Sequence, residues 1–270
     1  MDWPTVLRAF SLTLLAGMAT GIGGLIAFFA KKTNTTFLSY ALGFSAGVMI
    51  FISFTEILPE ANDIISSVYS GRTTALVTFS FFIGGFMLTA LIDKIIPMRD
   101  NPHEMMRVEQ MNVKLDTRDP KLLRIGLFTA IALGIHNFPE GIATFMAAMT
   151  DMRVGVSIAI AVAIHNIPEG IAVSVPVYYA TGSRKKALKW SVLSGFAEPL
   201  GGLAGFLLIS TFSSELVLGY VFAMVAGIMV YIAFDELLPA AHKFGKHHVA
   251  IYGLLSGIIV IGISLIMLDG

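Results

Sequence analysis

Long apolar stretches, separated by short polar segments, follow one another along almost the whole chain. Spanning the hydrocarbon core of a membrane takes roughly 20 apolar residues of helix, and eight stretches reach about this length. They cover residues 4–30, 37–57, 73–96, 121–148, 153–180, 186–211, 216–240 and 249–268. The pattern predicts an all-α polytopic membrane protein with eight transmembrane helices, forming one transmembrane domain over residues 1–270.

Composition supports this fold class and narrows the partners. Hydrophobic residues make up 56% of the chain and charged residues only 13%, whereas about a quarter of a soluble domain is charged. Most of the surface is therefore expected to face the lipid bilayer. The formal net charge is zero, which gives no electrostatic support for a nucleic-acid partner. The sequence contains no cysteine, which excludes disulfides and thiolate metal sites.

Basic residues predict the orientation of the helices. Fifteen of the 18 lysines and arginines fall in segments on one side of the predicted membrane, and only Arg8, Arg72 and Arg153 fall on the other. Because positive charge accumulates in cytoplasmic loops, the crowded side is expected to be cytoplasmic. The long polar segment 97–120 then forms a cytoplasmic loop, and both termini lie outside.

Two internal repeats indicate how the helices are related. Residues Ala46–Ala61 and Ala226–Ala241 share nine of 16 positions, and 136–143 (HNFPEGIA) resembles 165–172 (HNIPEGIA). The first pair belongs to helices 1–3 and 6–8. These copies are five helices apart, so they cross the membrane in opposite directions. A 3+2+3 arrangement with inverted repeats follows, which is typical of secondary transporters with a site near the membrane midplane.

Helices 4 and 5 each carry an imidazole, an amide and a carboxylate at mid-membrane depth. Residues three and four apart share a helix face, and ionised groups at this depth are costly unless they are neutralised. No lysine or arginine lies nearby in either helix. A divalent metal ion is the simplest shared partner, since histidine and carboxylate are ordinary zinc ligands. The candidate ligands are His136, Asn137 and Glu140 in helix 4, and His165, Asn166 and Glu169 in helix 5.

Glu198, in the middle of helix 6, is a third carboxylate at about the same depth. With it, the three helices offer enough ligands for one or two metal ions. Met49 is a candidate thioether ligand, although its repeat equivalent, Met229, favours a packing role.

The paired HNxPEG motifs, the 3+2+3 arrangement and the SGFAEPLGG stretch at 194–202 resemble the ZIP (Zrt-/Irt-like) metal transporter family, and most of all its bacterial branch. The resemblance covers nearly all of the chain. It implies uptake across the cell's inner membrane toward the cytoplasm and a partly shared binuclear site, with no enzyme activity. The zinc ligands would be His136, Glu140, His165 and Glu169. The second site, linked to iron(II), would use Asn137, Glu140, Asn166, Glu169 and Glu198.

The implied cargo is Zn2+ and Fe2+, with Mn2+, Co2+ and Cd2+ as further candidates and no resident cofactor. One departure from many relatives is the loop between helices 3 and 4, which holds only His103 where those proteins are histidine-rich. Metal capture by that loop is therefore not expected.

Several alternatives stay open from the sequence. Polar residues in mid-membrane can bond a neighbouring helix, and Glu198 can be protonated and structural. An intramembrane metal hydrolase is a second functional class, although HExxH is absent, and a proton-coupled carrier or channel for a non-metal solute is a third. The oligomeric state is open, with a homodimer as one alternative. Acidic and histidine residues near helix ends are either relays for metal or interfacial groups: Glu56, Glu60, Asp63, Asp235, Glu236 and His242.

Overall fold

The computed structural model describes residues 2–29, 35–95, 120–211, 215–244 and 247–269, and within them every regular element is a helix. The helices join into eight rods. The elements are α1 (Trp3–Phe29), α2 (Thr35–Ile52), η1 (Ser53–Ile57), α3 (Leu58–Ser66), α4 (Arg72–Ile95), α5 (Pro120–Thr150), α6 (Met152–Thr181), α7 (Arg184–Gly195), α8 (Ala197–Thr211), α9 (Glu215–Ile232), η4 (Ala233–Leu237), α10 (Leu238–Phe244) and α11 (His247–Asp269).

The rods confirm the predicted all-helical membrane architecture. In the described part of the chain, seven of them are long and apolar enough to cross a membrane. The remaining rod, α5, has 31 residues. The predicted ends agree to within a few residues except in the second rod, which continues through α3 to Ser66 rather than stopping near residue 57. The predicted loop 97–120 lies almost wholly outside the described residues.

Two short π-helices interrupt equivalent places in the repeated rods. In η1 the Leu58 N–H donates to the Ser53 carbonyl, and in η4 the Leu238 N–H donates to the Ala233 carbonyl. A proline follows each segment after one leucine, at Pro59 and Pro239. Proline has no N–H for the α-helical ladder, and π-bulges are one of the ways a helix absorbs such an interruption. The two π-helices lie 180 residues apart, the same offset as the sequence repeat, so the repeat is structural as well.

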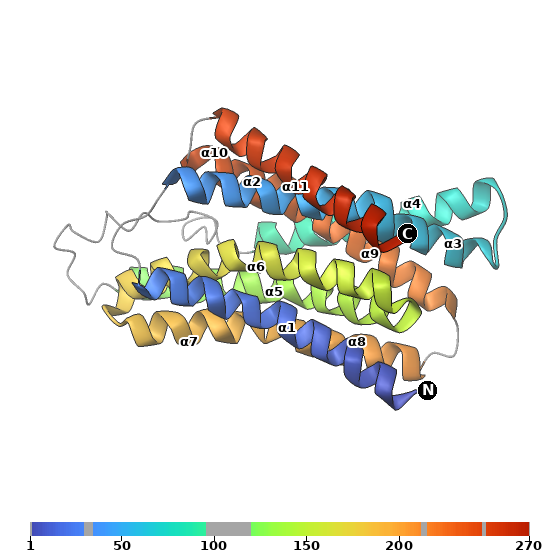
Figure 1. Ribbon diagram of the computed structural model, residues 1–270, viewed down its shortest axis with the longest axis horizontal. Coiled ribbons are helices and arrows are strands. Elements are labelled where there is room, and N and C mark those ends of the chain that lie inside the picture. The colour runs from blue at the N-terminus through green and yellow to red at the C-terminus, as the bar shows by residue number, and fades with distance from the viewer. Residues whose placement is uncertain (1, 30–34, 96–119, 212–214, 245–246, 270) are drawn as a thin grey trace.

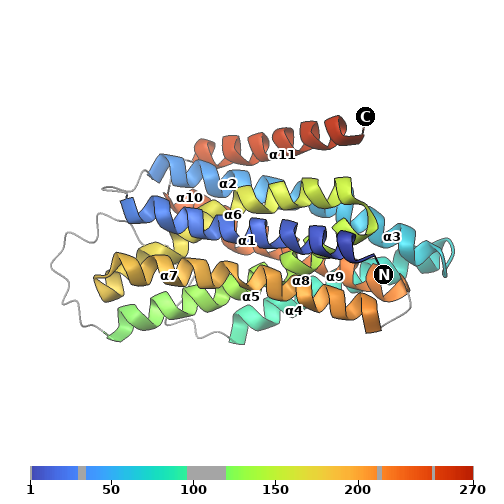
Figure 2. The same cartoon turned by 60° about the horizontal axis from the view of Figure 1, so that its bottom comes forward.

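The helices divide into two groups (Figure 1). One contains α1, α5, α6, α7 and α8, and the other contains α2, α3, α4, α9, α10 and α11. Helices α2 and α9 adjoin the first group through α6 and α5. Helix α1 begins and α11 ends at one end of the molecule, and a second view agrees (Figure 2).

Glycines let the second group pack backbone against backbone in two related contacts. A Cβ at Gly85 of α4 would collide with the Met224 carbonyl of α9, and a Cβ at Gly47 of α2 would collide with the Leu254 carbonyl of α11. Helix α4 therefore packs on α9 as its repeat equivalent α11 packs on α2. Between helices in lipid there is no hydrophobic driving force, and the close van der Waals packing that small residues permit takes its place.

Candidate metal centre

Helices α5 and α6 lie side by side and carry the two HNxPEG motifs inward. Both helices continue through the motif proline without a break. All six polar residues of the motifs are buried, with exposed fractions of 6% or less: His136, Asn137, Glu140, His165, Asn166 and Glu169. The motifs therefore place ionisable groups inside the protein, away from lipid.

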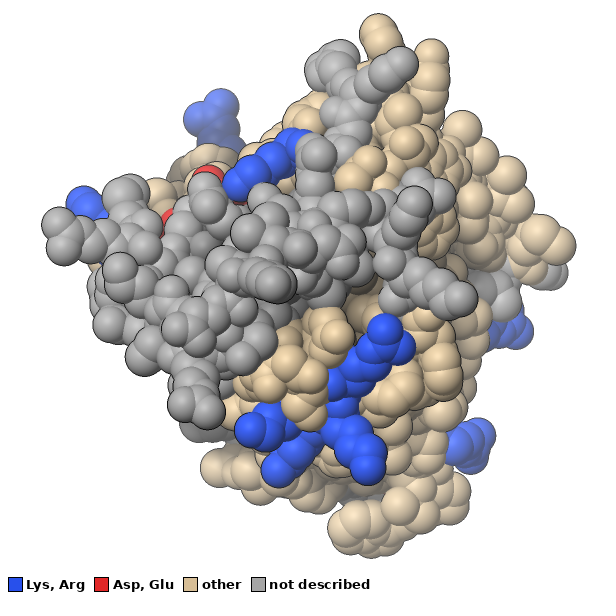
Figure 3. Space-filling view, turned by 90° about the vertical axis from the view of Figure 1, so that its left-hand side faces the viewer, with Lys and Arg blue, Asp and Glu red and all other residues tan. Residues whose placement is uncertain are grey.

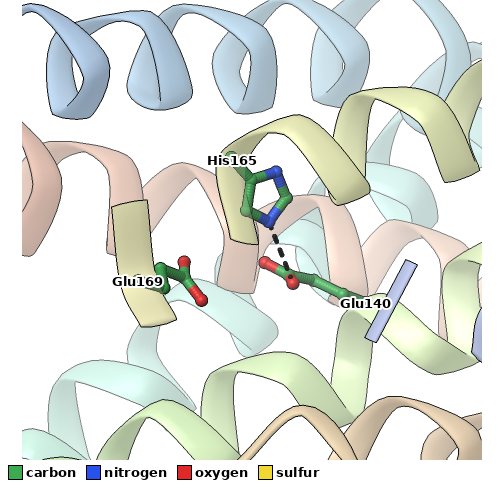
Figure 4. Close-up of side chains that lie close together, drawn as sticks. All are labelled: Glu140, His165 and Glu169. Carbon is green, nitrogen blue, oxygen red and sulfur yellow. Dashed lines mark hydrogen bonds and ion pairs between the residues drawn. The ribbon is translucent and has the colours of Figure 1, made fainter. Parts of the chain in front are cut away.

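Three of these side chains converge between the two helices (Figure 4). One ligand atom from each of Glu140, His165 and Glu169 lies within 4.8 Å of the others. His165 Nε2 is 3.1 Å from Glu140 Oε2. One imidazole and two carboxylates at this separation form a set that suits a divalent cation such as zinc.

Glu198 extends this cluster from a third helix. It is fully buried in the first turn of α8, just after the break between α7 and α8 that precedes Pro199. The Asn166 amide donates to Glu198 Oε1 and, at 2.9 Å, to the Ala16 carbonyl of α1. Asn166 thereby joins α1, α6 and α8 next to His165.

The glycine that ends each motif permits this close assembly. A Cβ at Gly141 would collide with the Glu198 carbonyl of α8, and a Cβ at Gly170 would collide with the Thr20 carbonyl of α1. Because glycine follows directly after each motif glutamate, the backbones of α8 and α1 come within reach of the site.

Several buried oxygens at the centre have no hydrogen-bond partner among the described residues. They are Glu140 Oε1, Asn166 Oδ1 and Glu198 Oε2. Buried polar atoms are normally satisfied, and leaving one unsatisfied is costly. A cation could bind these oxygens and so satisfy them.

His136 does not join the three-residue cluster. Its Nε2 lies 2.9 Å from Glu236 Oε1 on η4, which places a carboxylate of the second helix group against α5. Asn137, the next residue, is fully buried. Three of the predicted ligands, Glu140, His165 and Glu169, thus meet in one cluster, and Asn166 bonds Glu198 beside it. His136 makes a separate imidazole–carboxylate pair.

The sequence left Glu236 open, as a relay for metal or as an interfacial group, and did not connect it with His136. The apolar pattern put it near the end of its helix, where either role was open, and in the structure it is buried beside His136. The signal that points to it is the repeat, because Glu236 aligns with Glu56 in an otherwise apolar run. Met49 and Met229 are both buried in the apolar core, which favours their packing role.

Other acidic residues lie toward the end of the molecule where α1 begins. Glu56 and Glu60 line a pocket together with Asp151, the residue between α5 and α6. Asp63 is exposed on α3. At η4 and α10, Asp235 is exposed and His242 is half-buried.

Comparisons with known proteins agree with the helix arrangement and the motifs. A family model described as "ZIP Zinc transporter" matches residues 103–265. The zinc transporter ZupT of Lysinibacillus sphaericus is 56% identical over 264 residues, covering 97% of this chain and 98% of its own length. ZupT of Oceanobacillus iheyensis is 57% identical over 265 residues, with coverages of 97% and 98%. ZupT of Streptococcus mutans is 54% identical over 259 residues, with coverages of 96% and 97%.

Proposed function

The chain belongs to the ZIP family of zinc transporters, and we propose that it takes up zinc into the cell through the buried centre between α5 and α6. In this proposal Glu140, His165 and Glu169 hold the zinc ion during passage. The family is one of transporters rather than enzymes, and the protein is a multi-pass membrane protein.

Uncompensated negative charge carries the proposal. Three glutamates, Glu140, Glu169 and Glu198, are buried with exposed fractions of 1% or less. Neither α5 nor α6 has a lysine or arginine between residues 125 and 152 or between 154 and 181. Histidine alone can offset one charge, whereas a divalent ion offsets two and uses the oxygens that lack donors.

A second ligand set supports a wider cargo. Asn137, Asn166 and Glu198 supply oxygen ligands, together with the shared Glu140 and Glu169. Oxygen ligands suit Fe2+ and Mn2+, whereas sites that are selective for zinc are richer in nitrogen and sulfur ligands. We therefore include Fe2+ and Mn2+, with Co2+ and Cd2+ as further divalent ions, among the transported metals.

The His136–Glu236 pair is proposed as a neighbouring station for the same ion. It lies on the helix that supplies Glu140, and its carboxylate comes from the other helix group. An ion leaving the cluster would meet an imidazole and a carboxylate there before reaching water.

The orientation in the membrane is inferred from the basic residues. We propose that the end of the molecule with the α6–α7 junction faces the cytoplasm, because 15 of 18 basic residues lie in segments on that side. Both termini then lie outside a cell membrane.

The experiment that tests the function is metal uptake into proteoliposomes containing an indicator dye. Zn2+ should enter vesicles that hold the purified protein and not empty vesicles, and external chelator should stop it. Fe2+, Mn2+, Co2+ and Cd2+ should each compete with zinc. Absence of zinc entry with correctly folded, inserted protein would overturn the proposal, and competition by none of the other metals would restrict it to zinc.

A further inference from the structure

Four basic residues begin α7 at the end of the molecule opposite to the start of α1. Arg184, Lys185, Lys186 and Lys189 fall within the first two turns of this helix, and all four are exposed. Figure 3 looks onto this end, where blue side chains gather in a group bordered by tan and grey surface. The residues visible as acidic in this view lie away from the group.

Helical geometry turns three of the lysines in one direction. Lys185 and Lys189 are four residues apart and Lys186 and Lys189 are three apart, so their side chains share a face. The opposite side of the helix is fixed, because Ala187 packs on Val173 and Val177 of α6. Among the residues that the structure describes, none of these three lysines forms an ion pair.

Neighbouring residues fix this face near the edge of the membrane. Trp190 and Tyr178 pack beside Ala187 and are only partly buried, as is typical of aromatic residues at a membrane–water boundary. The Arg184 guanidinium donates to the Phe28 carbonyl of α1 at 2.6 Å and lies 5.8 Å from the Tyr178 ring centre. Arg184 therefore ties together the ends of α1, α6 and α7, and the three lysines project from a rigid junction.

We propose that Lys185, Lys186 and Lys189 form a binding site for the headgroup of an anionic phospholipid. The lysines supply three cations at headgroup depth, and Trp190 lies where the upper part of an acyl chain would run. A phosphate among several lysines is a strong charge match. An anionic phospholipid therefore fits this site better than a zwitterionic phospholipid, whose positively charged headgroup nitrogen repels the lysines. If the three lysines served only to orient the protein during membrane insertion, the folded protein would bind no lipid at this place.

The two tryptophans make the site directly measurable. Trp3 lies at the start of α1, at the other end of the molecule, and Trp190 lies next to Lys189. A Trp3→Phe variant leaves Trp190 as the only tryptophan. Its fluorescence in vesicles containing brominated phosphatidylglycerol or brominated phosphatidylcholine then reports which lipid occupies the adjacent position.

In the Trp3→Phe protein, brominated phosphatidylglycerol should quench Trp190 at mole fractions at which brominated phosphatidylcholine does not. Adding Lys185→Gln, Lys186→Gln and Lys189→Gln should lower the preference for the anionic lipid at least tenfold, since each lysine near an anionic headgroup contributes about fivefold. Changing the same three lysines to arginine should keep the preference. A matched control removes three charges from the opposite end with Arg8→Gln, Arg72→Gln and Arg153→Gln, and it should also keep the preference.

Equal quenching by the two lipids in the Trp3→Phe protein would overturn the proposal. So would an unchanged preference in the lysine-to-glutamine variant, or the same loss in the control variant. Millimolar inorganic phosphate distinguishes the two sources of phosphate: abolition of the lipid preference would show a site for free phosphate instead. Size-exclusion profiles and circular dichroism establish that each variant is folded before its quenching is compared.

Discussion

Glu140 and Glu169 are the residues on which metal binding is expected to depend most. Glutamine in place of either keeps the shape of the side chain and removes one negative charge. Removing one partner from a buried charged group costs about 3–5 kcal/mol, which corresponds to zinc binding at least about 100-fold weaker. Near-complete loss of zinc uptake is expected in each variant, measured in proteoliposomes.

Thermal unfolding in metal-free buffer provides the control for these two variants. The empty proteins should stay folded, because the three buried glutamates carry more negative charge than the one clustered histidine offsets. Folded variants with ordinary uptake would mean that these carboxylates are structural.

The two motif histidines should differ in their effects. His165 lies in the carboxylate cluster, whereas His136 faces Glu236. His165→Ala should weaken equilibrium zinc binding at least about tenfold, since loss of an outer partner alone can cost this much at a metal site. His136→Ala should leave that binding nearly unchanged and slow uptake. Calorimetry on purified protein, together with uptake rates, separates the two effects, and equal losses of affinity would contradict this division.

At the residue scale, the sequence identified the polar groups that meet in the core but not the pairing of His136 with Glu236. Two copies of a His-Asn-Glu pattern in apolar helices are visible without a structure, and their burial follows from the cost of charge in lipid. The role of Glu236 stayed open because the predicted helix ended soon after it, near residue 240. Helix α10 carries the rod on to Phe244, which places Glu236 well inside it.

At the scale of single elements, two adjacent glycines of α4 should respond oppositely to alanine. A Cβ at Gly84 meets nothing within 4 Å, whereas a Cβ at Gly85 would collide with the Met224 carbonyl of α9. Gly84→Ala should therefore be neutral or raise stability by up to about 1 kcal/mol through helix propensity. Gly85→Ala should destabilise by about 1–3 kcal/mol through overpacking.

Thermal unfolding of the two variants in the same detergent tests this difference. Each is the control for the other, because they share the helix, the chemical change and the lipid-like environment. Equal melting temperatures would show that α4 and α9 move apart at no cost.

Hydropathy predicted the rods well because a membrane sets their length, but it did not predict their internal detail. The second rod continues to Ser66 because backbone hydrogen bonding persists through Glu60, Asn62 and Asp63, where apolar character ends. The π-helices were not predicted either. Their distinguishing bond, from an N–H to the carbonyl five residues earlier, changes no side chain, and only the following proline hints at it.

For the whole molecule, the charge bias makes a prediction about orientation. Because the chain has no cysteine, single cysteines can be introduced into a silent background. Ser70→Cys, exposed between α3 and α4, should react with an impermeant thiol reagent in intact cells. Asn101→Cys, in the predicted loop outside the described residues, should react only after the membrane is permeabilised. The reverse pattern would invert the predicted orientation.

The global arrangement of helices was predicted in part. The repeats indicated two related triplets, and the contact of α4 with α9 is indeed matched by that of α11 with α2. The division into two helix groups was not predicted. The division depends on which helices pack against the faces that carry Gly47 and Gly85. A sequence repeat alone does not say which helix packs against which.

The paired π-helices also bear on the ancestry of the protein. An inserted residue is an uncommon event, yet η1 and η4 occupy the same position in both triplets, 180 residues apart. A single insertion in a three-helix ancestor, followed by duplication of its gene, accounts for both. Because equivalent helices of the two copies are five rods apart, the descendants of that ancestor run in opposite directions within one chain.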